Sequence, residues 1–235
     1  MMRPKCTVTT GIRVYALATI LAATLLVAAA AGAMAASEEE AQGIVDKARV
    51  VFGGFMRDDN YSWMHGHLKD AKGVLIYPQV LKAGFIFGGS GGTGVLLSRE
   101  GKTGEWSDPA FYTMGSVSFG LQIGGEAAEV VLLVMSQKGM DSLLTSNFKL
   151  GGDVSVALGP VGGGGKSDVT TDFLSFSRSQ GLYAGINLDG SYISVRDSLN
   201  KAYYGKEASP LDIIVKHSVS NKGAVPLREE LKKAK

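Results

Sequence analysis

The first patterned stretch after a long apolar leader is typical of an amphipathic helix. Ser37 precedes Glu40 by three residues, the spacing of a capping box in which a hydroxyl and a carboxylate satisfy free amides at a helix start. Apolar side chains then recur at the helical period of 3.6 residues, at Ile44, Ala48, Val51, Phe52 and Phe55. The pattern predicts one helix with a single apolar stripe, whose end the pair Gly53-Gly54 should weaken.

The apolar period changes from the helical value to two at Gly73, after a polar segment over 58–70 that we interpret as a linker. Alternation of this kind is typical of antiparallel strands with one solvent-facing side. It is clearest over 116–123, 153–158 and 182–189. By contrast, residues 130–135 are apolar throughout, which indicates a strand that is covered on both faces.

The remaining pattern completes an α+β fold. Short helices are expected after Ser136, after Asp197 and after Pro210, and a charged helical tail over 227–235. We expect a strongly bent antiparallel sheet of about eight or more strands, with a barrel as the limiting form of its curvature. The N-terminal helix should lie on this sheet.

An internal repeat runs through the strand-rich region. Gly84, Gly120 and Gly181 begin three copies that align without gaps, each with a second glycine four residues later. Each copy has the pattern of a strand, a glycine-containing turn and a return strand, so three related hairpins are predicted. Glycines at such places mark bulges, bends or close backbone approach. Backbone geometry therefore accounts for the excess of glycine, of which the chain has 32 among 235 residues.

Residues 1–35 have the organisation of an export signal. Three cations precede an almost wholly apolar run over 14–31, and Ala33-Met34-Ala35 then forms a small-x-small pattern, so cleavage is expected before Ala36. An uncleaved membrane anchor is the alternative, because the apolar run is long for a signal peptide. We expect an exported protein that is periplasmic or extracellular, or peripheral on a membrane.

Charge and cysteine content exclude several classes of protein. The chain carries 24 Lys and Arg against 22 Asp and Glu, but three of the cations lie in the leader, so residues 36–235 have a net charge of −1. This balance gives no basis for nucleic-acid binding. The single cysteine, Cys6, also lies in the leader, so the exported part can form neither a disulfide nor a Cys-based zinc site.

Three glycine-rich stretches match nucleotide-binding or catalytic spacings without the context that those motifs need. Residues 89–94 fit G-x-G-x-x-G and residues 88–92 fit G-x-S-x-G, but both motifs require a following helix, and a strand is predicted there. Residues 160–167 resemble a phosphate loop, with proline in place of the first glycine. His65 and His67 alone are too few ligands for a metal site. We therefore expect no enzymatic activity, no nucleotide and no cofactor.

Several motifs in series resemble the SYLF domain family. They occur in the family's order and spacing at Val74–Gly89, Gly104–Phe111, Gly120–Gly124, Leu158–Gly162, Gly181–Gly185 and Tyr203–Gly205. The resemblance runs from about Glu40 to about Ser218. We therefore interpret residues 36–218 as one SYLF-like domain, followed by a charged tail over 219–235.

The resemblance implies a lipid-binding module. Eukaryotic members bind phosphoinositides and other acidic lipids, some associate with cortical actin, and an amphipathic N-terminal helix is implicated in their membrane contact. Bacterial members are mostly exported, and an export leader makes actin an unsuitable partner for this chain. Phosphoinositides in turn do not suit a bacterial envelope. The resemblance therefore implies an anionic phospholipid of a bacterial envelope, such as phosphatidic acid, phosphatidylglycerol or cardiolipin.

The candidate lipid-contacting residues combine apolar side chains with cations. On the predicted helix they are Lys47, Arg49, Phe52, Phe55 and Arg57, and near the glycine turns the further cations are Lys82, Lys149, Lys166 and Arg178. The helical stripe could equally be core against the sheet, and the three consecutive glutamates at the helix start would repel an anionic surface. The alternative function is a non-catalytic structural or partner-binding envelope protein, with its protein partner unidentified.

Overall fold

The computed structural model describes residues 36–84, 87–101, 103–119, 124–162, 170–179 and 188–234. The predicted leader over 1–35, the glycines that begin the second and third copies of the repeat, and Lys166 lie outside the described residues.

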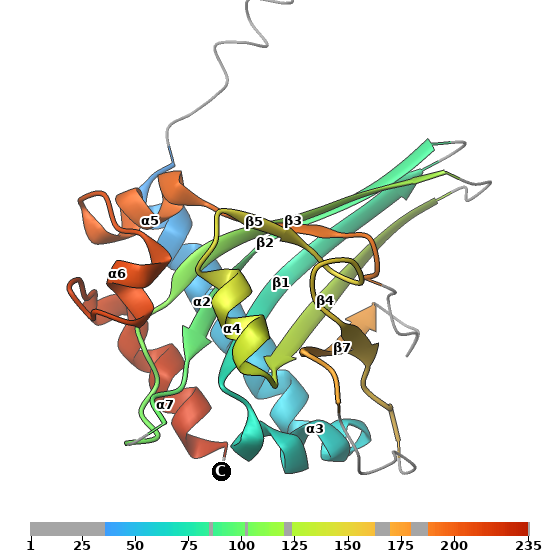
Figure 1. Ribbon diagram of the computed structural model, residues 1–235, viewed down its shortest axis with the longest axis horizontal. Coiled ribbons are helices and arrows are strands. Elements are labelled where there is room, and N and C mark those ends of the chain that lie inside the picture. Colours follow the sequence, from blue (N-terminus) through green and yellow to red (C-terminus); the bar gives the residue numbers. More distant parts are fainter. Residues whose placement is uncertain are drawn as a thin grey trace, which may run out of the picture. The chain divides into compact units, whose positions relative to one another are not determined.

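A long helix precedes a sheet that short helices surround (Figure 1). The helices are α2 (Glu38–Arg57), α3 (Ser62–His67), α4 (Gln137–Leu143), α5 (Asp197–Tyr204), α6 (Pro210–Ile214) and α7 (Val225–Lys233), with 3-10 helices at Asp59–Tyr61, Leu68–Asp70 and Lys222–Ala224. The strands are β1 (Gly73–Gly84), β2 (Phe87–Ser98), β3 (Ala110–Phe119), β4 (Gly124–Val134), β5 (Asn147–Lys149), β6 (Val156–Leu158), β7 (Phe173–Ser179) and β8 (Tyr192–Val195). The short helices predicted after residues 136, 197 and 210 and near the C-terminus are confirmed.

Helix α2 begins where the capping box predicts. The Ser37 Oγ accepts a hydrogen bond from the Glu40 amide at 3.0 Å, which satisfies one of the free amides of the first turn. The helix continues past the glycine pair Gly53-Gly54 and ends three residues later at Arg57. Tertiary contacts override the low helix propensity of glycine there, since side chains of other elements lie against both glycines.

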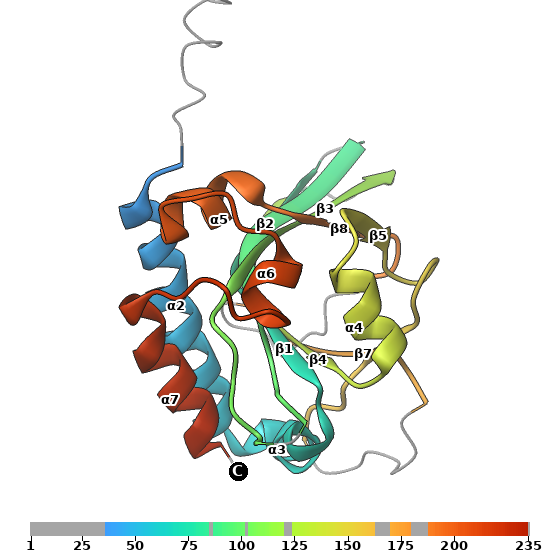
Figure 2. The same ribbon diagram turned by 60° about the vertical axis from the view of Figure 1, so that its left-hand side comes forward.

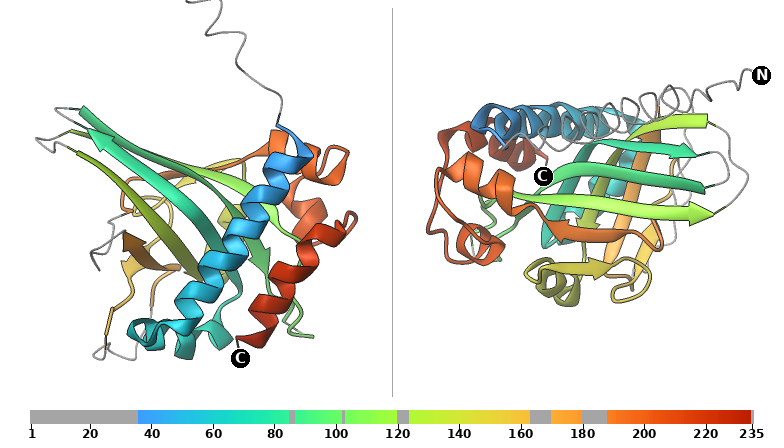
Figure 3. Two further views of the ribbon diagram at one scale, coloured as in Figure 1. Left: turned by 180° about the vertical axis from the view of Figure 1, so that it is seen from behind. Right: turned by 90° about the horizontal axis from the view of Figure 1, so that it is seen from above.

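The α+β class and the strong curvature of the sheet are confirmed (Figures 1 and 3). Eight strands form one sheet in the order β5-β8-β3-β2-β1-β4-β7-β6, bent into a half-barrel. Their pairings are antiparallel except that β6 and β7 are parallel, which the sequence pattern did not predict. One hydrophobic cluster lies between α2 and the sheet, and a second lies on the opposite face. Strand β4 contributes to both clusters, as its continuous apolar run predicts.

Only the first of the three predicted hairpins is a hairpin. Strands β1 and β2 pair with each other, but β3 and β4 lie on opposite sides of that hairpin, and β7 and β8 lie further out on the two sides. Antiparallel pairing brings the C-terminal ends of β1, β3 and β7 to the same end of the sheet. The three glycine copies therefore mark three connections at that end, each joining a pair of strands that lies outside the previous pair. Local pattern predicts a turn but not whether its two strands pair.

The interpretation of residues 58–70 as a linker was wrong. This segment forms α3 with a short 3-10 helix on each side. Tyr61, Met64 and Leu68 are spaced three and four residues apart and are at most 1 % exposed. The buried Tyr61 hydroxyl donates to the Ser177 carbonyl at 2.9 Å, which fixes this segment to β7. A helical stripe of only three residues in a polar stretch was too short a signal to recognise.

The C-terminal helix α7 is held against α2 (Figure 2). Leu227 and Leu231 are at most 1 % exposed and join the cluster between α2 and the sheet. On the outer side of α7, Arg228 lies 3.7 Å from the Asp108 carboxylate. Burial raises the pKa of Asp108, and the nearby Arg228 guanidinium offsets part of that rise. Residues 36–235 thus form one compact unit that includes the last helix.

Candidate functional site

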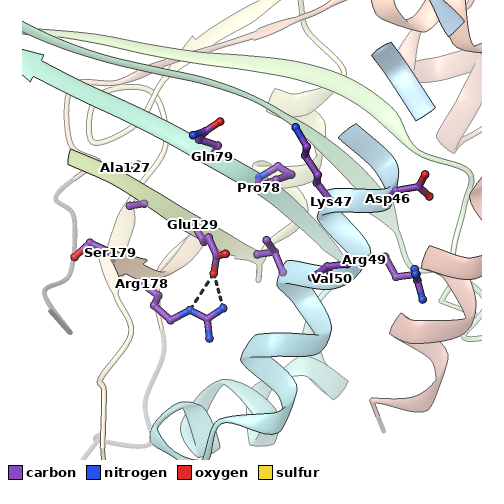
Figure 4. Close-up of a pocket in the computed structure, with 12 residues that line it drawn as sticks. Asp46, Lys47, Arg49, Val50, Pro78, Gln79, Ala127, Glu129, Arg178 and Ser179 are labelled. Carbon is purple, nitrogen blue, oxygen red and sulfur yellow. Dashed lines mark hydrogen bonds and ion pairs between the residues drawn. The ribbon is translucent and has the colours of Figure 1, made fainter. Parts of the chain in front are cut away.

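A groove of about 900 Å³ lies where the exposed side of α2 diverges from strands β1, β4 and β7 (Figure 4). Its lining consists of Asp46, Lys47, Arg49, Val50 and Val51 from α2, Pro78 and Gln79 from β1, Ala127, Ala128 and Glu129 from β4, and Arg178 and Ser179 from β7. The groove therefore combines apolar side chains with charged ones, and ligand-binding pockets in proteins commonly combine apolar surface with a few placed polar groups.

A bulge in β1 shapes the floor of the groove. The pairing register of β1 shifts between Ile76 and Gln79 against β2, and between Tyr77 and Val80 against β4. Pro78 lies inside this shift, where its missing N–H costs no ladder hydrogen bond. A bulge bends a strand and increases its twist. The groove lies beside this bend.

Arg178 is the most firmly placed cation of the groove. Its Nε and Nη2 atoms donate to the Glu129 Oε2 atom at 2.9 and 2.5 Å. Both side chains are about one third exposed, at 30 % and 33 %. The ion pair therefore joins β7 to β4 while it remains in reach of a ligand in the groove.

The Arg178 guanidinium also lies against α2. It is placed over the Phe55 ring at 5.1 Å from the centroid, a distance at which the ring face attracts a cation. A Cβ atom at Gly54 would lie 2.9 Å from the Arg178 Nη2 atom. Glycine at this position is what allows the guanidinium to approach the helix, and the ring and Glu129 then hold it in one orientation.

The rim on the α2 side carries an exposed apolar residue and further charges. Val50 is 62 % exposed, and it projects with Lys47 toward the strands, whereas Arg49 projects from the other side of the helix (Figure 4). The lining also includes two carboxylates, those of Asp46 and Glu129, beside the three cations Lys47, Arg49 and Arg178.

The structure separates the predicted residues of α2 into two groups. Lys47 and Arg49 both belong to the groove lining, although only Lys47 projects toward the strands, while Phe52 and Phe55 are fully buried against the sheet. Arg57 is exposed at the last turn of α2 and is not part of the groove lining. In the described structure the helical stripe is core, and a role of the two phenylalanines in lipid contact stays a prediction that would require α2 to detach.

The predicted lysines of the strands are not brought to the groove. Lys82 is opposite Glu126 and Ser90 in the sheet, on the face that points away from α2. Lys149 is on β5, where its ammonium lies 5.6 Å from the centre of the Tyr192 ring. Their roles in lipid binding also stay predictions.

Sequence reasoning missed Val50, Gln79 and Glu129 as lining residues. Glu129 is the one charged residue within the apolar stretch 127–135, which is a detectable signal for a charge that has an opposite partner in the fold. The sequence indicates Arg178 only as a cation near a glycine turn. No local pattern shows that residues 49 positions apart form an ion pair.

The glycine motif of β2 and the two histidines have structural roles, whereas most of the motif over 160–167 lies outside the described residues. Residues 89–94 lie within β2, which continues as a strand to Ser98, so the strand context predicted for this motif is confirmed. His65 Nε2 donates to the Phe55 carbonyl at 2.9 Å, and His67 Nδ1 donates to the Trp63 carbonyl at 2.8 Å. Among the described residues, no three His, Cys, Asp or Glu side chains gather closely enough to hold a metal ion.

Within the described part of the chain, no helix has both the length and the apolar character needed to cross a membrane.

Comparison with known proteins identifies the family. The Ysc84 family model, described as Las17-binding protein actin regulator, matches residues 115–234, about half of the chain. The chain belongs to the Ysc84 family. The resemblance to the SYLF domain that the sequence motifs indicate is therefore confirmed.

Curated relatives of the family come from yeasts and mammals. The chain is 35 % identical over 166 residues to SH3 domain-containing protein PJ696.02 of Schizosaccharomyces pombe. This match covers 68 % of this chain and 37 % of that protein. It is 36 % identical over 145 residues to Protein YSC84 of Saccharomyces cerevisiae, and 35 % identical over 145 residues to LAS seventeen-binding protein 3 of the same species. Each of the latter two matches covers 59 % of this chain and 31 % of the relative. The chain thus spans about a third of the length of these relatives.

Proposed function

We propose that this chain is a non-catalytic lipid-binding domain that recognises anionic phospholipid at the groove between α2 and the sheet. The observation that carries the proposal is the placement of Lys47 and Arg178 beside the exposed Val50 in one groove. Cations near an anionic surface contribute about 1 kcal/mol each. An adjacent apolar side chain can enter the interface between headgroups and acyl chains.

This proposal changes the mechanism that the sequence pattern suggests. Phe52 and Phe55 need not leave the core, because Lys47 and Val50 of the same helix and Arg178 of β7 are already accessible to solvent at the groove. The folded domain can therefore bind lipid without the cost of exposing two phenylalanines. The predicted leader supports an exported protein, which would meet phospholipid in a cell envelope.

Sedimentation with vesicles tests the proposal. The protein should bind phosphatidylcholine vesicles that contain phosphatidylglycerol and should bind phosphatidylcholine alone weakly, with the difference reduced at high salt. Lys47→Gln should lower the affinity about fivefold, the equivalent of about 1 kcal/mol. Lys206→Gln is the matched control, because Lys206 is exposed and is not part of the groove lining. Equal binding to the two kinds of vesicle would contradict the proposal.

A protein partner is the second candidate function. It is favoured by the name of the relative LAS seventeen-binding protein 3 and by the description of the family, which both refer to Las17. On this proposal the groove or another surface would bind a polypeptide of the compartment in which the chain resides. Crosslinking in cells through a photoreactive residue at position 50, followed by mass spectrometry, distinguishes a protein adduct from a lipid adduct.

A further inference from the structure

The sheet continues beyond α2 on the face that this helix covers (Figure 3). The groove residue Ala127 is the first member of a row that crosses four strands. Its cross-strand neighbours are Leu81 on β1, Gly91 on β2 and Gly115 on β3. Leu81 is 56 % exposed, so this part of the face lies open to solvent.

A second row on the same face lies further from the helix. It consists of Gly125, Ala83, Gly89 and Val117, again one residue from each of the four strands. Val117 is 95 % exposed. Neither row contains a charged side chain or a side chain that can form a hydrogen bond.

The row between these two points to the opposite face and is polar. It consists of Glu126, Lys82, Ser90 and Ser116. The two serine hydroxyls are 2.8 Å apart and hydrogen bonded. Because successive residues of a strand point to opposite faces, the four strands form an amphipathic extension. Its apolar face is continuous with the groove.

Three glycines of the apolar face are not required by close contacts among the described residues. A Cβ atom at Gly91 would meet only the Met114 carbonyl at 3.5 Å, and one at Gly115 or Gly125 would meet only a carbonyl at 3.9 Å. These are ordinary van der Waals distances. At Gly94, by contrast, a Cβ atom would lie 2.4 Å from the Ile76 carbonyl oxygen. Glycine in a strand costs conformational entropy, so an open, flat surface is the physical effect that Gly91, Gly115 and Gly125 provide.

We propose that this face holds an acyl chain of a single bound phospholipid whose anionic headgroup lies at Lys47 and Arg178. The inference rests on the proposed function and specifies how the lipid is held. The cations lie at the α2 end of the surface, and the two rows beyond them are uncharged. This order of charge matches that of an amphiphile, with the headgroup in the groove and the chain along the strands. Glycines on β2 leave space for the chain between Leu81 and Val117.

Chain-length dependence of binding tests the proposal. The probes are hexadecanoyl and hexanoyl lysophosphatidylglycerol, each below its micelle concentration, with affinity measured by calorimetry on the protein from Ala36 onward, a compact unit. The wild type should bind the long-chain probe at least about tenfold more tightly, because each buried methylene adds to affinity. The double variant Gly91→Val and Gly115→Val should remove this preference by filling the space above β2 and β3.

Two further variants keep the test decisive. Ser116→Val introduces the same side chain on the polar face and should preserve the chain-length preference. Val117→Asp changes a residue that is 95 % exposed, so it should fold normally, yet it should weaken binding of the long-chain probe alone. If the glycine variant fails to fold, Val117→Asp carries the test.

Three outcomes would overturn the proposal. Equal affinity for the two probes in the wild type shows that no acyl chain is held. An equal loss of preference in Ser116→Val shows that the effect does not come from this face. A lipid-free dimer that Val117→Asp dissociates shows that a second copy covers the surface. If vesicle binding persists in any of these cases, only this inference fails; if vesicle binding also fails, the proposed function fails with it.

Discussion

Truncation of Phe55 decides whether the apolar stripe of α2 is core. The Phe55 side chain is fully buried, its ring lies 4.5 Å from the Tyr61 ring between centroids, and Arg178 lies over its face. Removal of a buried phenylalanine side chain costs about 3–5 kcal/mol, which includes the loss of its partners and the cavity left behind. Domains of this size have unfolding free energies of about 5–15 kcal/mol. Phe55→Ala should therefore remove a large share of the stability.

Urea unfolding measures this loss, with fluorescence of Trp63 and Trp106 and circular dichroism as two probes. The matched control is Val50→Ala on the same helix, where the side chain is 62 % exposed and the change should stay within about 0.5 kcal/mol. In the vesicle assay Val50→Ala should weaken binding, while the folded variant Phe52→Leu, which keeps the Phe55 ring against Arg178, should retain it. A cost below about 1 kcal/mol for Phe55→Ala would refute the assignment of this face to the core.

Three further predictions concern the sheet and its surroundings. Gly94→Ala should destabilise the protein by about 1–3 kcal/mol, because the new Cβ meets a backbone oxygen at 2.4 Å, whereas Gly91→Ala should be neutral or stabilising in the same urea assay. Burial raises the pKa of Asp172, but hydrogen bonds from two serine hydroxyls and an amide outweigh this and lower the pKa below its usual value. The stability that the ionised Asp172 contributes is therefore present above about pH 3.9 and is lost as the pH falls through the lower folded-state pKa. Asp172→Asn should accordingly cost stability at pH 7 and progressively less in acid, and a pH-independent cost would contradict this. Asn200→Leu should cost about 1–3 kcal/mol by leaving the buried Phe111 amide without its side-chain acceptor at 2.9 Å, which thermal unfolding will show.

Much of the local structure follows from the sequence alone. The capping serine and the apolar stripe specify α2, and the run over 130–135 specifies a strand that is buried on both faces. Both are decided by residues within a few positions of each other. The family and the α+β class are recognisable for the same reason, since the motifs and the change of period are local. Lys47, Arg49 and Arg178 were also recognisable as cations suited to an anionic ligand.

Tertiary structure alone decides which of these elements meet. The nested strand order depends on pairings between distant segments, so identical glycine patterns give one hairpin and two longer connections. The sequence gives no reason for glycine at position 54. The reason is the guanidinium of Arg178, more than a hundred residues away in the chain, which lies against this position in the fold. Burial of Phe52 and Phe55 likewise depends on the sheet that α2 covers. Local periodicity determines that a face is apolar, whereas packing determines whether protein or solvent lies against it.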